Sequence, residues 1–187
     1  MLFRSIFALF LAGKVPVMLN WTAGKNVLNH ARKIGEFDVT ITAKRFLDKI
    51  HLEDLGEVEE TFLFLEDIKD EMTLKKKVKG ALRALSSPSK IMSHFGLDRN
   101  GDKTALLLFT SGSEAMPKAV PLSHTHILTN QRGAISLSGM CGDDWLYGVL
   151  PPFHSFGLSL TGLLPILAGL KVLDRKSTRL NSSHSSV

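Results

Sequence analysis

The sequence predicts an α/β fold in which parallel-rich sheets are covered by helices on both faces. Apolar runs of strand length alternate along the chain with segments of helical periodicity. Most of the strand candidates are continuous apolar runs, as expected for strands that are buried on both faces. No repeat of fixed period is visible, which argues against a solenoid or a propeller.

The composition is that of a globular chain and excludes several classes of function. The 187 residues suffice for one domain, and hydrophobic residues, 44% of the chain, can form a core. A net charge of +5 is too small to indicate nucleic acid as a partner. The single cysteine, Cys141, excludes an internal disulfide and fits a reducing, cytosolic compartment. The apolar N-terminal run is too short to span a bilayer, and we expect a core helix there rather than a signal peptide.

In the first half of the chain, apolar runs give the strands, and residues with helical spacing give the helices. Helices are predicted at 6–13, 23–35, 44–50 and 74–87, and strands at 14–20, 38–43 and 61–68. Asn20 or Thr22 can cap the second helix, and Gly35 suits its C-terminal end. Pro88 is expected to stop the basic helix that precedes it. The lysines of that helix form a solvated face in the simplest interpretation, and an anionic membrane or an acidic carrier protein is the alternative.

The second half continues the alternation after a polar turn at 98–103. Strands are predicted at 104–112, 118–124, 144–151 and 170–173, and helices at 125–139 and 155–169. Ser123 or Thr125 can cap the first of these helices, and Pro165 is expected to kink the second. His124 and His126 lack a carboxylate or thiol partner in register, so we do not expect them to bind a metal.

The segment between the strands at 104–112 and 118–124 contains small hydroxyl residues, one glycine and one lysine. Gly112, Pro117 and Lys118 have the spacing of a P-loop. However, proline replaces the second glycine, and Ala119 stands where a P-loop has a magnesium-binding Ser or Thr. A P-loop must also open a helix, whereas a strand follows here. We therefore reject the P-loop interpretation.

A phosphate site in a hairpin-like turn fits the same residues better. Thr110, Ser111 and Ser113 offer hydroxyl donors, and Gly112 lets the backbone approach a ligand closely. Consecutive loop N–H groups can form an anion-binding nest, and Lys118 can supply a cation. A purely structural turn, with its hydroxyls bonded to the backbone, is the simpler alternative.

This segment resembles the phosphate-binding signature of the adenylate-forming ligases, the superfamily of acyl-CoA synthetases, acyl-carrier-protein synthetases and peptide-synthetase adenylation domains. The signature reads Thr-Ser-Gly-Ser/Thr-Thr-Gly-x-Pro-Lys-Gly, followed by an apolar strand and a Ser/Thr-His pair. The matching residues are Thr110, Ser111, Gly112, Ser113, Pro117, Lys118, Ser123 and His124. Glu114, Ala115 and Ala119 depart from it. A glutamate after Ser-Gly-Ser, as at position 114, resembles the sequence of the branch that acts on fatty acids and acyl carrier protein. The resemblance implies part of the large N-terminal domain of such a ligase.

A second segment, "LPPFHSFG" at 150–157, is similar to the family pattern Leu-Pro-x-Phe-His-x-Phe-Gly. The resemblance implies that Phe153, His154, Phe156 and Gly157 border the adenylate and the acyl pocket. His154 would help to seat the carboxylate and is the one candidate catalytic residue. Without its motif, His154 would be interpreted as a structural histidine.

The resemblance also implies a two-step reaction that uses ATP and Mg²⁺. A fatty acid would be activated as an acyl-adenylate and then transferred to the thiol of acyl carrier protein or CoA. Thr110, Ser111, Gly112, Ser113 and Glu114 would bind the nucleotide, and Lys118 would neutralise the leaving pyrophosphate. The metal ligands are not assigned. We expect a cytoplasmic protein without a nucleic-acid partner, with the whole protein peripheral to or tethered at the inner membrane.

Two alternatives stay open. A degenerate homologue would bind a nucleotide or an acyl group without catalysis, and the departures at Glu114, Ala115 and Ala119 motivate it. The chain could also be the ligase half of a membrane-bound bifunctional acyltransferase and acyl-carrier-protein synthetase.

Both ends of the chain resemble a translated sequencing adapter. Codons for residues 2–5 and for residues 174–177 can be written as reverse complements, apart from a frame offset, and the tail is Ser-rich and without periodicity. We therefore expect residues 1–5 and 174–187 to be adapter-derived and residues 6–173 to be a partial AMP-binding domain, inactive by itself.

Overall fold

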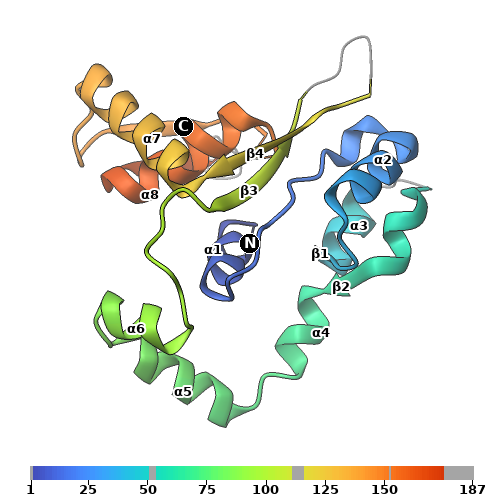
Figure 1. The fold of residues 1–187 in the computed structure, drawn as a ribbon, viewed down its shortest axis with the longest axis horizontal. Coiled ribbons are helices and arrows are strands. Elements are labelled where there is room, and N and C mark those ends of the chain that lie inside the picture. Colours follow the sequence, from blue (N-terminus) through green and yellow to red (C-terminus); the bar gives the residue numbers. More distant parts are fainter. Residues whose placement is uncertain (1, 51–53, 111–115, 152, 175–187) are drawn as a thin grey trace, which may run out of the picture. The chain divides into compact units, whose positions relative to one another are not determined.

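The computed structural model describes residues 2–50, 54–110, 116–151 and 153–174 (Figure 1). The chain divides into two compact units. The first unit contains Met1–Asn100 and Ala105–Val120, and the second contains Gly101–Thr104 and Pro121–Val187. Strands alternate with helices in both, so the predicted α/β class is confirmed.

The first unit begins with helices and short parallel strands. Its helices are α1 (Leu2–Leu11), α2 (Lys25–Gly35), α3 (Lys44–Ile50), α4 (Leu65–Asp70), α5 (Leu74–Ala84) and α6 (Pro88–His94), with 3₁₀ turns η1 (Trp21–Ala23) and η2 (Gly56–Thr61). Strand β1 (Thr40–Thr42) pairs in parallel with β2 (Phe62–Phe64), and Ile41 lies opposite Leu63. The connection between them carries α3 and η2 (Figure 1), as a parallel pair requires.

Strands β3 (Thr104–Phe109) and β4 (Ala119–Ser123) pair with each other. The Thr110 N–H donates to the Lys118 carbonyl, and the His124 N–H donates to the Lys103 carbonyl. These bonds join the start of one strand to the end of the other, so the pair is antiparallel. The two strands that flank the predicted hairpin-like connection are therefore paired as a hairpin requires.

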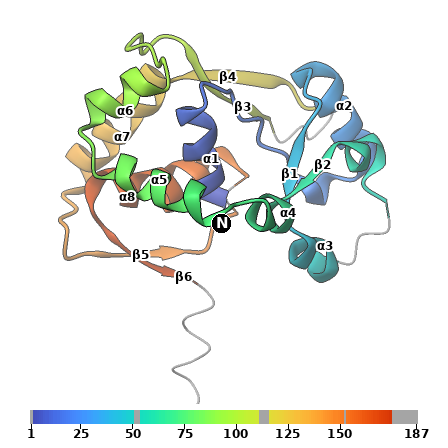
Figure 2. The same cartoon turned by 90° about the horizontal axis from the view of Figure 1, so that it is seen from below.

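The second unit combines α7 (His124–Ser138), strands β5 (Trp145–Gly148) and β6 (Lys171–Asp174), and a helix that changes its winding. This helix is a π-helix, η3, over Gly157–Leu163 and continues as α8 (Leu164–Ala168). Strands β5 and β6 lie side by side in Figure 2 and pair in parallel, with Trp145 opposite Lys171.

The N-terminal strand that we predicted at 14–20 is mostly absent. In the part of the chain that the structure describes, this segment makes one parallel bridge, between Val17 and Leu107. The Met18 N–H donates to the Leu107 carbonyl, and the Leu107 N–H donates to the Pro16 carbonyl. Pro16 has no N–H to donate, which limits how far the ladder can extend.

Both caps that we predicted for α2 are displaced. Asn20 caps the short turn η1 instead, because its Oδ1 accepts from the Thr22 N–H at 3.1 Å. At the other end Gly35 is still helical, and Glu36 takes the left-handed conformation with φ 46°. A Cβ on Gly35 would lie 3.0 Å from the Phe37 ring, so the absence of a side chain at Gly35 leaves space for that ring.

Other boundaries also differ from the prediction. The strand expected at 61–68 ends at Phe64, where α4 begins with Glu66 and Asp67 in its first turn. Both acidic residues favour a helix N-terminus. The basic helix ends at Ala84, and Pro88 starts the next helix instead of only stopping the previous one. Pro165 likewise stands in the first turn of a helix, α8, directly after the π-helix η3.

Ser123 caps α7, as one of the two predicted alternatives. Its Oγ accepts from the His126 N–H at 3.1 Å, while Nδ1 of His126 accepts from the Ser123 N–H at 3.3 Å. His126 is thus part of a capping box. None of the helices in the described part of the chain combines the length and apolar character that a bilayer crossing requires.

Candidate functional site

The candidate phosphate loop is closed at its base by Thr110 and Lys118. The Thr110 N–H donates to the Lys118 carbonyl at 3.0 Å, and the Lys118 N–H donates to Oγ1 of Thr110 at 2.9 Å. Both residues are exposed. The predicted residues Ser111, Gly112, Ser113 and Glu114 lie outside the described residues.

Strand β3 gives this base a rigid support. Ala105, Leu106 and Leu108 are buried, and Leu106 has no exposed surface. The bridge from Val17 adds a parallel neighbour on one side of the strand. The apolar run that precedes the loop therefore fixes the position of Thr110, as expected for binding loops carried on buried strands.

A third contact holds the other side of the loop base. Nε2 of His30, on α2, lies 3.0 Å from the carbonyl oxygen of Pro117, which is buried. A carbonyl can only accept, so Nε2 must carry the proton. The residue before Lys118 is thus tied to a helix that stands 87 positions earlier in the chain. The sequence analysis missed His30, because no local sequence pattern indicates a hydrogen-bond partner that is 87 positions away in the chain.

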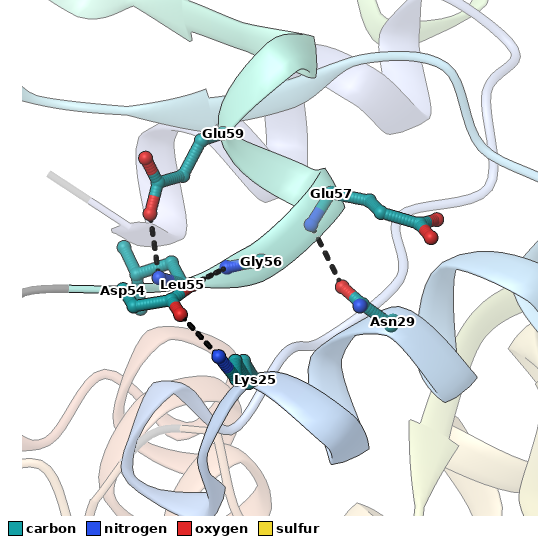
Figure 3. Close-up of polar contacts among 7 residues, drawn as sticks. All are labelled: Lys25, Asn29, Asp54, Leu55, Gly56, Glu57 and Glu59. Carbon is teal, nitrogen blue, oxygen red and sulfur yellow. Dashed lines mark hydrogen bonds and ion pairs between the residues drawn. The ribbon is translucent and has the colours of Figure 1, made fainter.

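Helix α2 is in turn held by η2 and the residues before it (Figure 3). The Glu57 N–H donates to Oδ1 of Asn29 at 2.8 Å, and Lys25 forms an ion pair with Asp54. Oδ1 of Asp54 also accepts from the Gly56 N–H at 2.9 Å. The hydrogen bond from Lys25 and then that from Gly56 lower the pKa of Asp54, and the same bond with Asp54 raises the pKa of Lys25.

Apolar packing and one further bond reinforce this arrangement. Leu28 of α2 packs in a core with Leu55 and Val58. Nη1 of Arg32 donates to the Glu57 carbonyl at 2.6 Å. An open hollow of about 600 Å³ lies beside α2, and its lining includes Asn29, His30, Arg32, Lys33, Phe37 and Glu57. His30 therefore lies between this hollow and the loop base.

The predicted aromatic–histidine segment belongs to the second unit. The rings of Phe153 and His154 are 4.7 Å apart, with their planes inclined by 51°. The His154 N–H donates to the Pro151 carbonyl at 3.2 Å, and the His154 carbonyl accepts from the Leu158 N–H at 2.8 Å. His154 and Phe156 are both exposed. The backbone of His154 is thus fixed while its ring stays accessible.

Gly157 is required by the tight turn that precedes η3. It is buried, and a Cβ in its place would overlap the carbonyl group of Pro151 and lie 3.2 Å from the carbonyl carbon of Leu150. No larger residue fits while this turn keeps its shape. The glycine of the motif therefore has a structural reason that the sequence pattern did not reveal.

A polar network connects α7 with η3. Nε2 of Gln131 donates to Oγ of Ser159 at 2.6 Å, and that hydroxyl donates to Oδ1 of Asn130 at 2.9 Å. Gln131 is buried, and its Oε1 has no hydrogen-bond partner among the described residues. This network holds the π-helix, and with it the start of η3 at Gly157, against α7.

The structure places the two groups of predicted site residues in different units. Thr110 and Lys118 are brought together in the first unit, and Phe153, His154, Phe156 and Gly157 form one segment of the second. Asp143 and Asp144 are turn residues: one pairs with Lys171, and the other accepts from the Cys141 N–H. Within the described segments, no three His, Cys, Asp or Glu side chains gather in a way that could hold a metal ion.

Comparison with known families assigns the chain. Residues 2–184 match the family described as "AMP-binding enzyme". The chain belongs to this family, in agreement with the adenylate-forming signature of its loop.

Curated relatives agree with this assignment over parts of the chain. The "Probable 4-coumarate--CoA ligase 3" of Dictyostelium discoideum is 35% identical over 103 residues, which are 48% of this chain and 19% of that protein. The medium-chain fatty-acid–CoA ligase of Escherichia coli K12 is 33% identical over 72 residues, 38% of this chain and 13% of that protein. The fatty acyl-CoA synthetase A of D. discoideum is 26% identical over 164 residues, 83% of this chain and 24% of that protein. The chain thus spans a quarter or less of these relatives.

Solved structures share the fold. The O-succinylbenzoate coenzyme A synthetase of Bacillus subtilis, in complex with ATP and magnesium ion, matches 97% of this chain with a TM-score of 0.69 and 20% identity, over 34% of its own length. ATP-bound MatB of Rhodopseudomonas palustris matches 99% of the chain with a TM-score of 0.68 and 19% identity, over 36% of its own length. The fold is that of part of the N-terminal domain of an adenylate-forming ligase, as predicted.

Proposed function

We propose that the complete product of the gene encoding this chain activates a fatty acid with ATP and transfers it to a thiol. The acid carboxylate attacks the α-phosphorus, the bond to the β-phosphate breaks, and pyrophosphate leaves. A thiol then attacks the acyl carbon and displaces AMP. The family membership and the names of the relatives support this proposal.

The observation that carries the proposal is the closed base of the loop. Thr110 and Lys118 exchange two hydrogen bonds there, so the ends of strands β3 and β4 are joined at the point where the loop begins and ends. We assign Thr110, Ser111, Gly112, Ser113 and Glu114 to the nucleotide, with backbone N–H groups and hydroxyls directed at the β- and γ-phosphates. Preorganised donors of this kind stabilise the charge that develops during phosphoryl chemistry.

Lys118 has the second role at the loop. Its side chain is exposed, and its main chain is bonded on both sides to Thr110. We propose that its ammonium group stabilises the negative charge of the departing pyrophosphate. Mg²⁺, when bound, would neutralise phosphate charge in the same step, and its protein ligands are not assigned.

His154 and its neighbours are proposed to receive the acid. The imidazole is exposed on a backbone fixed by hydrogen bonds at both its N–H and its carbonyl group. Such a ring can donate a hydrogen bond to a carboxylate without losing its position. We assign Phe153, Phe156 and Gly157 to the wall of the same pocket. The names of the relatives favour CoA as the thiol acceptor, and acyl carrier protein is the alternative. We place the protein in the cytoplasm.

The test is acid-dependent exchange between ATP and labelled pyrophosphate, catalysed by the complete gene product. We expect exchange with a fatty acid, and formation of an acyl thioester when CoA is added. Lys118→Ala should lower the exchange rate about a hundredfold, in line with the loss of one charged donor in a phosphoryl site. Lys14→Ala, at another exposed lysine, is the matched control and should exchange at the wild-type rate. Absence of exchange with every chain length would contradict the proposal.

One observation favours a second candidate, a homologue that binds ligands without catalysis. Glu114, Ala115 and Ala119 replace residues of the family signature, and two of the changes remove a glycine. This candidate predicts nucleotide binding without exchange. It also predicts that glycine at positions 115 and 119 leaves exchange absent, so a gain of activity in that variant would exclude it.

A further inference from the structure

Helix α5 presents an apolar face to solvent along its whole length. Leu74, Val78 and Leu82 lie on one side of the helix, with Leu85 at its C-cap. The four side chains are exposed by 77%, 51%, 64% and 85%. None of the residues of α5 is buried. An apolar face of this size is typical of a surface that binds something else.

The remaining faces of α5 are strongly basic. Four lysines and one arginine stand between Leu74 and Ala84, and no acidic residue is among them; they are Lys75, Lys76, Lys77, Lys79 and Arg83. With successive residues turned by about 100°, Lys75 and Lys77 fall on the two edges of the apolar face. Their long side chains can bring the ammonium groups to an interface while their stems cover apolar surface.

The first turn of α5 is capped by a side chain of the protein itself, before any ligand binds. Oγ1 of Thr73 accepts from the Lys76 N–H at 3.3 Å and caps α5. A capped helix presents its apolar and basic faces before it meets a ligand, so binding does not have to include the cost of folding it.

We propose that α5 lies on the surface of an anionic lipid bilayer. The leucine and valine side chains enter the boundary between headgroups and acyl chains, and the basic residues contact anionic headgroups. Apolar residues on one side and lysines on the other are the pattern of helices that lie in this plane. An acidic protein would also attract the lysines. A bilayer fits better, because it accepts a convex apolar face over its full length without needing a complementary groove.

The proposal is independent of catalysis and is tested by sedimentation of the complete gene product with vesicles. We expect binding to phosphatidylcholine vesicles that contain phosphatidylglycerol, and binding at least about tenfold weaker to vesicles of phosphatidylcholine alone. Added salt should weaken the binding to the anionic vesicles.

Two pairs of variants separate the apolar from the basic contribution. Leu82→Ser should weaken binding about tenfold, whereas Leu137→Ser on α7, at a leucine that is 91% exposed, should leave it unchanged. Replacing the four lysines of α5 by glutamine should abolish the preference for anionic lipid. The matched control replaces four scattered exposed lysines by glutamine and so changes the net charge equally; it should keep most of the preference for anionic lipid. The four control lysines are Lys14, Lys33, Lys49 and Lys90.

A fluorescent label shows whether the face is available. The exposed Cys141 is first replaced by serine, and an environment-sensitive dye is attached at Leu82→Cys. The emission should shift to the blue when anionic vesicles are added. A label that is already shielded without vesicles would show that another part of the protein or a second copy covers α5, and would overturn the proposal. Equal vesicle binding by Leu82→Ser and Leu137→Ser, or binding of an acidic carrier protein in place of vesicles, would also overturn it.

Discussion

Nε2 of His30 lies 3.0 Å from the carbonyl oxygen of Pro117 and ties helix α2 to the residue before Lys118. If the loop holds phosphates, this hydrogen bond keeps one of its ends in place. His30→Leu should raise the KM for ATP about fivefold, the effect of losing one net hydrogen bond, and should change kcat less. Steady-state kinetics of pyrophosphate exchange measure both constants.

The glutamine variant provides the control for His30. A glutamine amide can donate to the same carbonyl, so His30→Gln should recover most of the affinity for ATP, while His30→Leu should not. If both variants weaken ATP binding equally, the histidine acts through packing and not through its N–H.

Gly56 stands beside Asn29 in a conformation that other residues avoid. Its φ is +75°, and a Cβ would overlap the Asn29 amide, which accepts from the Glu57 N–H. Gly56→Ala should lower the free energy of unfolding by about 2–3 kcal/mol, through backbone strain and loss of that hydrogen bond. Gly80→Ala on helix α5 is the matched control, because a Cβ at Gly80 would have no other atom within 4 Å. It should stabilise by roughly 0.5–1 kcal/mol. Thermal melting distinguishes the two.

The ion pair of Lys25 with Asp54 should make stability depend on pH in the acid range. The pKa of Asp54 is lowered in the folded state, first by the hydrogen bond from Lys25. Its contribution to stability is therefore complete above the ordinary aspartate pKa and is lost as the pH falls through the lowered value. Asp54→Asn should melt earlier than wild type at neutral pH, and this difference should shrink on acidification and at high salt. A difference that grows on acidification would contradict the assignment.

Gly157 should be intolerant of any side chain. Gly157→Ala forces a methyl group against the Pro151 carbonyl, and such overpacking costs about 1–3 kcal/mol. The turn that carries His154 must then shift, so the KM for the fatty acid should rise along with the loss of stability. Gly133→Ala on α7, where a Cβ meets nothing within 4 Å, should leave the KM unchanged and, like Gly80→Ala, should stabilise by roughly 0.5–1 kcal/mol. Wild-type kinetics in Gly157→Ala would argue against a substrate site at this turn.

The elements that were predicted well are those with strong local signals. The helix at 44–50 has the predicted bounds, and the Ser123 cap of α7 follows from hydrogen bonds within one turn. The C-cap predicted at Gly35 was wrong, because the left-handed residue is Glu36, and Gly35 instead makes room for the neighbouring Phe37 ring. The strand predicted at 14–20 is mostly absent, because apolar character predicts burial, whereas strand pairing also needs N–H groups and Pro16 has none to donate.

The candidate site divides in the same way. The motifs that nominate Thr110, Lys118, Phe153 and His154 are contiguous in the chain and can be read from the sequence, and the roles of these residues stay predictions. His30 and Asn29 were not found, because they act through single contacts with residues far along the sequence. Gly157 was found as a motif residue, but its steric reason became visible only when Pro151 was placed next to it.

The contact between His30 and Pro117 also has a consequence for the order of folding. It closes a loop of 87 residues, and a closure of that length is entropically unfavourable until the intervening elements have formed. The loop base should therefore be completed late, after α2 and the β3–β4 pair have each formed. Newly synthesised chains should therefore form native helices before the contact between His30 and Pro117 is made. If the loop binds a nucleotide as proposed, that nucleotide should stabilise the chain only after this contact has formed.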